Sequence, residues 1–251
     1  MVTDLVGDVC LNPAQTFTPN GPLRKGMETP ETIRTAYTDF VLETGSQPVS
    51  VFAFAKKLGM AEADFYTQYG SFDAIEADIW LTFFDDTRQK LEADPTYQTY
   101  SVREKLLAFY YTWIEGLKAQ RSFVVYSVGR LRAGAAPGMR SARPGPAAAI
   151  GSNSRTLQPF RNAFFDFIRD LLAEGRESRE VEPRPFVTDR YSSALWAQTL
   201  FLLDFWVRDV SRNFEQTDTA IEKSVNTAFD LIGRSPLDSL FDLAKFVYQN
   251  R

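Results

Sequence analysis

Apolar residues recur every three or four positions along most of this chain, which is the spacing of amphipathic helices. In the first part of the chain the spacing predicts helices that end at glycines or at Asp94-Pro95, over residues 29–45, 50–59, 62–69 and 72–91. Later in the chain it predicts helices over residues 102–120, 123–131, 157–175, 188–210, 217–232 and 236–248. Because the sequence has neither strand-like alternation nor a repeat of fixed period, we expect an all-α protein.

Two segments lack this periodicity. Residues 1–26 mix Asn, Pro and Gly, which predicts a flexible leader, and residues 133–154 are rich in Gly, Pro and Ala, which predicts a mobile loop. The single cysteine, Cys10, lies in the leader with no basic neighbour to lower its pKa, so we expect an inert thiol.

The amino-acid composition limits the kinds of catalytic and metal site that the chain can form. The 251 residues are 44% hydrophobic and 14% aromatic, which predicts a folded chain, and they contain no histidine. With one cysteine and no histidine, disulfides, histidine-based catalysis and the common zinc sites are excluded, and no glycine motif for a nucleotide is present. We therefore expect no enzyme activity, no metal and no cofactor. The chain start lacks a signal peptide and the apolar run 191–207 is interrupted by polar residues, so we expect a cytoplasmic protein.

The stretch 32–79 carries a specific motif. Its elements are Ile33 and Ala36, Val49-Ser50-Val51, Phe54-Ala55, Leu58-Gly59-Met60 and Phe65-Tyr66-Thr67-Gln68-Tyr69, followed by Gly70. This pattern resembles the amino-terminal domain of the TetR family of transcriptional regulators. The remainder is similar to a TetR carboxy-terminal domain in its amphipathic helices and in the segment Leu171-Leu172-Ala173-Glu174-Gly175.

The resemblance implies a TetR-like, all-helical fold. Residues 27–76 would form a three-helix helix-turn-helix (HTH) domain, and residues 77–251 a larger helical domain for ligand binding and dimerisation. It further implies a ligand-responsive transcriptional regulator that binds DNA as a homodimer. The DNA-contacting side chains would be Ser50, Lys56, Lys57, Tyr66, Thr67 and Gln68.

Charge argues against this DNA contact. Between Met27 and Trp80 the sequence has three basic residues against nine acidic ones, and Glu62 and Asp64 open the recognition helix, where they would repel phosphates. One alternative is therefore a structural module in which Phe65, Tyr66 and Tyr69 form the core. In that case the chain would be an accessory or carrier protein that has left DNA and binds a hydrophobic lipid or isoprenoid.

The larger domain offers two candidate surfaces. Aromatic residues on its helices could line a pocket for a hydrophobic small molecule or lipid, or could simply be core: Phe109, Tyr110, Trp113, Phe123, Tyr126, Phe164 and Phe167. The helix 188–210 is apolar on nearly every face, so we expect a partner subunit to cover part of it, unless one chain buries it completely. Its predicted interface residues are Leu195, Trp196, Phe201, Leu202, Phe205 and Trp206.

Positive charge gathers in a single segment. Residues 121–155 contain six arginines and neither Asp nor Glu. These arginines could face an anionic partner, such as a membrane surface or a phosphate-bearing ligand, or could form a solvated loop. The residues proposed for such a partner are Arg130, Arg132, Arg140 and Arg143.

Overall fold

The computed structural model describes residues 29–133, 150, 154–181 and 188–232. These residues form nine α-helices and three short 3-10 helices, and within these ranges there is no strand, so the predicted all-helical fold is confirmed. The leader with Cys10, Arg140, Arg143 and the predicted helix 236–248 lie outside the described residues. So does nearly all of the predicted loop 133–154, although Ile150 within it is described and is buried.

Three helices form a small amino-terminal domain: α1 (Pro30–Thr44), α2 (Val51–Leu58) and α3 (Glu62–Gln68). Thr29 and Ser50 cap the first two helices by accepting hydrogen bonds from backbone N–H groups three residues ahead. Gly45 and Gly59 end the same helices with φ values of 70° and 74°, a backbone conformation that other residues adopt at a cost. The turn between α2 and α3 thus follows directly from the local sequence.

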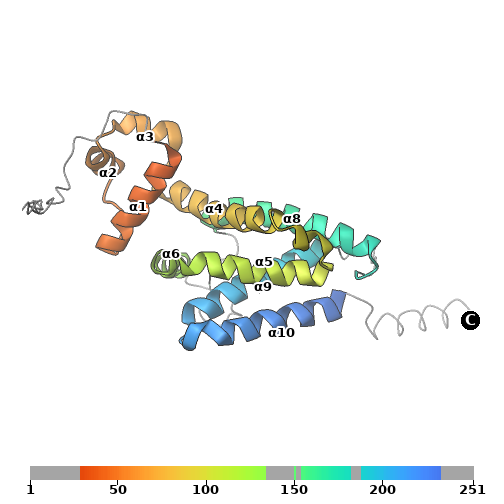
Figure 1. Cartoon of the computed structure of the whole chain (residues 1–251). Coiled ribbons are helices and arrows are strands. Elements are labelled where there is room, and N and C mark those ends of the chain that lie inside the picture. The colour runs from red at the N-terminus through yellow and green to blue at the C-terminus, as the bar shows by residue number, and fades with distance from the viewer. Residues whose placement is uncertain (1–28, 134–149, 151–153, 182–187, 233–251) are drawn as a thin grey trace, which may run out of the picture.

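Helix α4 (Phe72–Glu92) belongs to both parts of the molecule. It begins at Ser71, whose side chain accepts a hydrogen bond from the Ala74 N–H, and runs from the small domain into the larger helical bundle (Figure 1). The expected domain boundary at residue 76 therefore falls inside a continuous helix. The two parts of the chain are joined by a rigid element instead of a linker.

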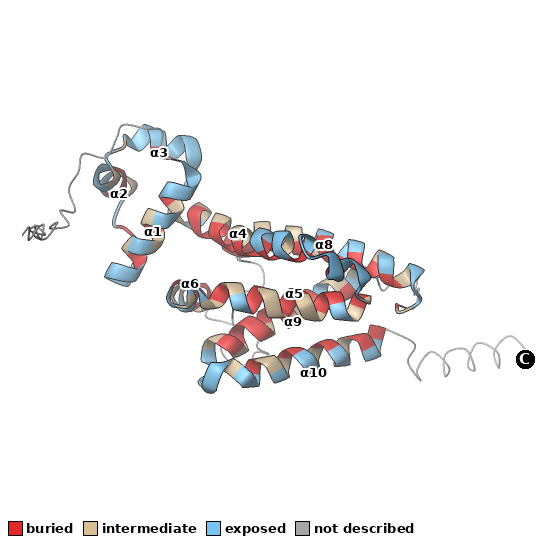
Figure 2. Ribbon diagram, in the orientation of Figure 1, coloured by how far each residue is buried: buried red, intermediate tan, exposed pale blue. Residues whose placement is uncertain are grey.

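The bundle contains α5 (Val102–Lys118), α6 (Arg121–Ala133), α8 (Gln158–Glu177), α9 (Thr188–Arg208) and α10 (Glu215–Ile232). Three 3-10 helices complete the described elements: η1 (Pro95–Thr99), η3 (Arg155–Leu157) and η4 (Arg212–Phe214). Helix α5 contacts α4, α8 and α10, and buried residues gather where these helices meet (Figure 2). Within the described ranges, no helix has the length and apolar character that crossing a membrane requires.

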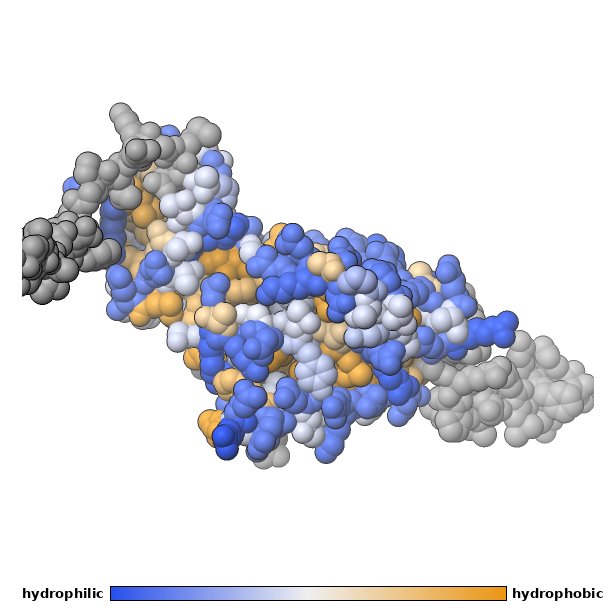
Figure 3. Space-filling view, viewed as in Figure 1, coloured by the Kyte–Doolittle hydropathy of each residue, from blue (hydrophilic) through white to orange (hydrophobic). Residues whose placement is uncertain are grey.

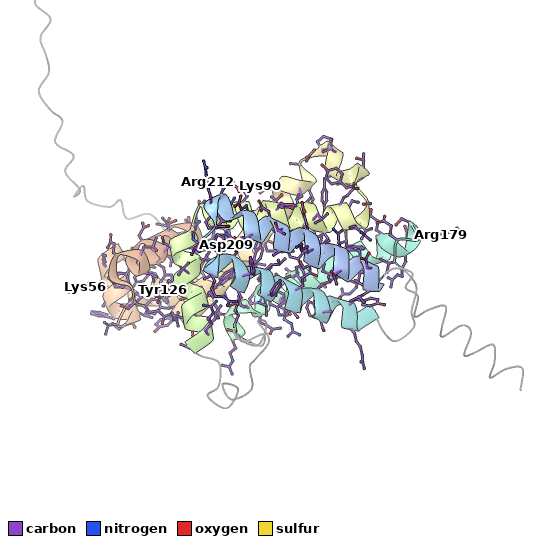
Figure 4. All side chains as sticks on the ribbon, turned by 90° about the horizontal axis from the view of Figure 1, so that it is seen from below. Lys56, Lys90, Tyr126, Arg179, Asp209 and Arg212 are labelled. Carbon is purple, nitrogen blue, oxygen red and sulfur yellow. The ribbon has the colours of Figure 1, made fainter. Side chains whose placement is uncertain are left out.

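The turn between α9 and α10 is fixed by Arg121. Its guanidinium lies 4.7 Å from the centres of both the Trp206 and Phe214 rings, and it donates 3.2 Å hydrogen bonds to the carbonyls of Trp206 and Val207 at the end of α9. Asn213 and Phe214 adopt positive φ angles of 52° and 62° within this turn. Asp209, labelled with Arg212 in Figure 4, accepts hydrogen bonds from the backbone and side chain of Thr217 and so caps α10.

Candidate functional site

The predicted DNA-contacting residues lie on α2 and α3 or at their starts. Lys56, Lys57, Thr67 and Gln68 are exposed, and the side chain of Tyr66 is 52% exposed. Ser50 is exposed as well, but its hydroxyl already accepts a hydrogen bond from the Ala53 N–H at 3.2 Å. The surface of α3 therefore presents neutral polar groups that can donate and accept hydrogen bonds.

Tyr66 does not have the core position that the structural alternative requires. Phe65 and Tyr69 are buried, whereas the Tyr66 ring meets Phe65 edge-on at 5.6 Å with its outer side toward solvent. The predicted core of the small domain is thus right for Phe65 and Tyr69 and wrong for Tyr66. The reason is the helical spacing, which places position 66 about 100° away from position 65.

Apolar side chains are also exposed on this domain. Val49, immediately before the cap residue Ser50, is fully exposed, and Phe52 on the first turn of α2 is 60% exposed. Figure 3 shows apolar groups on the visible face of the small domain. The apolar spacing of α2 indicates only its buried positions, Phe54 and Ala55, so it predicts no contact role for Val49 or Phe52.

Three of the acidic residues counted against DNA binding have arginine partners within the chain. Asp78 accepts hydrogen bonds from Arg34 at 2.7 Å and from the Tyr69 hydroxyl at 2.5 Å. Asp73 accepts a 2.9 Å hydrogen bond from Arg130, and Glu76, which is 1% exposed, also pairs with Arg130. Arg34 is already among the three basic residues counted, so these pairs change the charge balance by one, through the added positive charge of Arg130.

Glu62 and Asp64 keep their charge at the surface. Both are exposed in the first turn of α3, where the preceding residue, Ala61, provides no side-chain cap. Carboxylates at this position interact favourably with the positive end of the helix, so they stabilise α3 even though they would repel a phosphate. Lys57 is also partly engaged, since its ammonium lies 3.5 Å from Glu43.

The small domain and the bundle share a polar cluster around Glu76. One carboxylate oxygen accepts a 2.7 Å hydrogen bond from the Tyr37 hydroxyl of α1, and the other accepts a 3.0 Å hydrogen bond from the Ser127 hydroxyl of α6. Ser127 in turn accepts a 3.0 Å hydrogen bond from the Trp80 indole. Burial, followed by the charge of Glu76, raises the pKa of Tyr37, so its phenol stays protonated and remains a donor.

Arg130 completes this Glu76 cluster. It contacts both Asp73 and Glu76 on α4, and its pKa is raised because these carboxylates outweigh the effect of burial. The cluster thereby connects α1, α4 and α6 through charge-assisted hydrogen bonds. A change in the position of α6 would therefore alter its hydrogen bonds to Glu76 on α4 and, through Glu76, the hydrogen bond to Tyr37 on α1.

Four of the predicted pocket residues lie close together. The Phe109 ring is 5.1 Å from Phe167, 5.8 Å from Phe164 and 6.3 Å from Trp113, measured between ring centres. Phe160, absent from the prediction, lies among them and contacts Trp113 at 5.5 Å and Trp196 at 5.1 Å. These rings fill the space between α4, α5, α8 and α9. The assignment of a ligand to them stays a prediction.

The other predicted pocket residues are placed differently. Tyr110 points to α9, where its hydroxyl lies 3.0 Å from the Thr199 hydroxyl, and burial raises its pKa. Phe123 is buried on α6. Tyr126 is half-buried on the same helix, where burial raises its pKa and the charge of nearby Arg130 opposes that rise. Figure 4 shows Tyr126 on the side of the bundle that faces the small domain.

The predicted dimer interface on α9 is largely covered by the chain itself. Leu195, Trp196, Leu202 and Trp206 are at most 3% exposed. Phe201 and Phe205 are only partly buried, and their rings contact each other at 6.0 Å. The first four side chains serve the core of the single chain, which leaves Phe201 and Phe205 as the part of the predicted interface that a partner could reach.

The arginine segment is not a free basic face where it is described. Arg132 pairs with Asp204, a buried carboxylate of α9 that Arg208 also contacts, and Arg130 pairs with Glu76. Arg121 caps α9 as described above. Arg130 and Arg132 each have a carboxylate partner within the chain, and their assignment to an anionic partner stays a prediction.

A surface cleft of about 610 Å³ lies on α5 near the α9–α10 turn, with Lys90, Tyr111, Lys118 and Asn213 among its lining residues. Burial and the neighbouring Glu222 raise the pKa of Tyr111 to about 12. None of the seven predicted pocket residues lines this cleft. Among the described residues, no group of three or more Cys, Asp or Glu side chains is placed to hold a metal ion.

The fold has relatives among solved structures. The fatty acid degradation regulator FadR from Bacillus halodurans matches with 17% identity and a TM-score of 0.50, over 78% of this chain and 96% of that one. A protein of unknown function from Rhodococcus sp. RHA1 matches with 12% identity and a TM-score of 0.49, over 86% of this chain and all of that one. A regulatory protein of the TetR family from Rhodococcus RHA1 matches with 13% identity and a TM-score of 0.45, over 82% of this chain and 97% of that one.

The small three-helix domain followed by a helical bundle is similar in fold to the Bacillus halodurans protein. At 17% identity this likeness extends to the fold alone. In sequence, residues 145–247 match the family model described as the tetracyclin repressor-like C-terminal domain. This part of the chain is therefore similar to the carboxy-terminal domain of tetracyclin repressor-like proteins. No curated protein sequence matches it.

Proposed function

We propose that this chain is a ligand-responsive transcriptional regulator, without enzyme activity, that binds DNA as a homodimer. The observation that carries the proposal is the exposed row of Tyr66, Thr67 and Gln68 on α3. It is followed by α4, on which the acidic residues Asp73, Glu76 and Asp78 have arginine partners within the chain. A glutamine can form two hydrogen bonds with adenine, and a tyrosine or threonine hydroxyl can bond a phosphate.

Exposed apolar groups at the start of α2 also favour DNA contact by the small domain. Val49 and Phe52 flank Ser50 at the start of α2, and such groups can contact the methyl group of thymine. Lys56 and Lys57 at the other end of α2 supply positive charge. The chain would therefore bind DNA with few phosphate contacts and a correspondingly weak dependence on salt.

The test is fluorescence anisotropy with DNA from the region upstream of the chain's own gene, at about 50 and 200 mM salt. We expect sequence-selective binding that Gln68→Ala relaxes and that the double variant Lys56→Ala/Lys57→Ala weakens for every sequence. Lys90→Ala is the matched control, because Lys90 is an exposed lysine far from Lys56 in Figure 4. An equal loss in all three variants would contradict the proposal.

The homodimer is proposed to form through the outer face of α9, with Phe201 and Phe205 at its centre. Both rings are partly exposed and adjacent, as expected of apolar groups that a partner subunit covers. We expect Phe201→Glu/Phe205→Glu to convert the dimer to a monomer in sedimentation velocity. Val125→Glu on α6 is the control, since Val125 is 41% exposed and lies outside this face. A monomeric wild-type protein would refute this part of the proposal.

The second candidate function is an accessory or carrier protein that binds a hydrophobic lipid or isoprenoid and not DNA. It is favoured by Glu62 and Asp64, which are exposed at the start of α3, and by the absence of Lys and Arg from that helix. In that case the folded dimer would not bind DNA even at 50 mM salt, and lipid would be extracted together with the purified protein.

A further inference from the structure

Phe160 lies at the centre of an aromatic cluster in the bundle. Its ring contacts those of Trp80, Phe84, Trp113, Phe164 and Trp196, with ring centres between 5.1 and 6.4 Å apart. The Trp80 ring is nearly parallel to it, at 9°. A single phenyl ring from the first turn of α8 thus fills a slot between three tryptophans, contributed by α4, α5 and α9.

Two of these tryptophans have no hydrogen-bond partner. The indole N–H groups of Trp113 and Trp196 are buried, and neither makes a hydrogen bond to a described residue. By contrast, the Trp80 indole donates to Ser127. A buried donor without an acceptor is rare because it loses its hydrogen bond to water and gains none in return. Both unsatisfied donors belong to rings packed on Phe160.

The walls of the slot are uncharged phenyl and indole rings. The charged groups connected to these rings are already paired: Arg88 contacts the cluster at Phe167 and pairs with Glu92, and Glu76, which Ser127 links to the Trp80 indole, pairs with Arg130. An anionic group that entered the slot would lose its hydration without gaining a counter-ion there. A neutral acceptor such as a carbonyl oxygen loses much less, and its two lone pairs can accept two hydrogen bonds.

We infer that the slot held by Phe160 is the ligand site of the bundle, and that it takes a flat, uncharged aromatic ligand with a carbonyl oxygen. The ligand displaces the Phe160 ring and accepts hydrogen bonds from the indoles of Trp113 and Trp196. Trp196 was predicted as a dimer contact and Phe160 was not singled out, so neither role follows from the sequence. This inference rests on the proposed function in assigning the ligand to this domain.

The test compares two probes of the same shape. Fluorenone and fluorene have the same three-ring skeleton, and only fluorenone carries a carbonyl. Binding to the full chain without DNA is measured by calorimetry, so that a failure of DNA binding leaves the result intact. Because a net hydrogen bond of about 0.5–1.5 kcal/mol corresponds to roughly 2- to 12-fold in affinity, we expect fluorenone to bind about 10-fold more tightly than fluorene.

Variants test whether the indole N–H groups of Trp113 and Trp196 cause the preference for fluorenone. Trp113→Phe and Trp196→Phe should each reduce the preference for fluorenone several-fold while fluorene binding changes little. Trp206→Phe is the matched control: its indole N–H is also buried and unpaired, but its ring packs against Phe214 and Arg121, outside the cluster. Phe160→Ala should tighten the binding of both probes, because no ring then has to leave the slot.

Equal affinity for the two probes in the wild-type protein would overturn the inference and needs no variant. So would a preference for fluorenone that survives the double variant Trp113→Phe/Trp196→Phe, or tighter binding of fluorene-9-carboxylate than of fluorenone. Absence of binding of both probes to wild type and to folded Phe160→Ala would overturn it as well. If fluorenone binds as expected but leaves DNA binding unchanged, the result supports the ligand site and contradicts the proposal that the chain is a ligand-responsive regulator.

Discussion

The hydroxyl of Tyr37 donates a 2.7 Å hydrogen bond to the carboxylate of Glu76, which is 1% exposed. Tyr37 belongs to the small domain, whereas Glu76 lies on α4 and is also bound by Ser127 and Arg130 of the bundle. Polar contacts at one buried carboxylate thus link the small domain to the bundle, in addition to the continuous helix α4.

Replacing Tyr37 by phenylalanine removes one donor from Glu76 and keeps the ring. We expect the free energy of unfolding to fall by about 1–2 kcal/mol, because the buried carboxylate loses a hydrogen bond. Urea denaturation measures this change. Tyr66→Phe is the control, since Tyr66 is half exposed, and should change stability by less than about 0.5 kcal/mol. Equal effects of the two variants would contradict the role of the Tyr37 hydroxyl.

Replacing Arg130 by methionine leaves the buried Glu76 without its cation. We expect a loss of about 3 kcal/mol or more in the free energy of unfolding, since an uncompensated buried charge is costly. Adding Glu76→Gln should recover part of this loss, and a double-mutant cycle measures the coupling. Arg169→Met is the control, because its pair with Asp166 is 68% exposed on both sides. Strict additivity of the Arg130 and Glu76 changes would exclude a direct interaction.

Local signals explain why so much of the fold follows from the sequence. Ser50 and Ser71 start helices, Gly45 and Gly59 end them, and Ser101 with Glu104 forms a capping box at α5. Each signal acts within a few residues, so the sequence alone places these helix boundaries to within a few positions. The caps therefore define the helices that carry the candidate sites.

The partners of polar side chains do not follow in this way. Arg132 is paired with Asp204, 72 positions later, and the Tyr110 hydroxyl meets Thr199, 89 positions later. Because such partners are set by helix packing, the sequence shows a basic segment and a set of aromatic residues without their contacts. For the same reason a sequence count cannot separate the carboxylates engaged by Arg34 and Arg130 from those that stay at the surface.

Acid should weaken the contact between Asp73 and Arg130. Burial would raise the pKa of Asp73, but hydrogen bonds from Arg130 and Gln47 lower it below the usual 3.8. A carboxyl whose pKa is lower in the folded state stabilises the protein above its unfolded pKa, and this contribution disappears as the pH falls through the folded pKa. Since Asp73 is largely exposed, we expect about 1 kcal/mol or less at pH 7.

The measurement is the Tm of the wild-type protein and of Asp73→Asn. At pH 7 the variant should melt at a lower temperature, and the difference should shrink as the pH falls from about 5 to about 3. A difference that stays constant over this range would show that the charge of Asp73 does not contribute.

Neutralising the start of α3 should affect DNA binding and stability in opposite directions. In Glu62→Gln/Asp64→Asn we expect several-fold tighter DNA binding at about 50 mM salt, because two charges that repel phosphates are removed. The free energy of unfolding should fall by about 0.5–1 kcal/mol, because the same charges favour the positive end of the helix. Anisotropy and urea denaturation measure the two effects. Glu177→Gln, an exposed change in the bundle, should leave DNA affinity as it is.

The continuity of α4 has a mechanical consequence. With 21 residues and a rise of about 1.5 Å per residue, the helix is about 31 Å long. Since one rigid rod crosses from the bundle into the small domain, a tilt of about 5° at its bundle end would displace its other end by about 2.7 Å, close to the length of a hydrogen bond. A repacking of side chains in the bundle is thereby geometrically amplified at α3, without any bending of the chain between them.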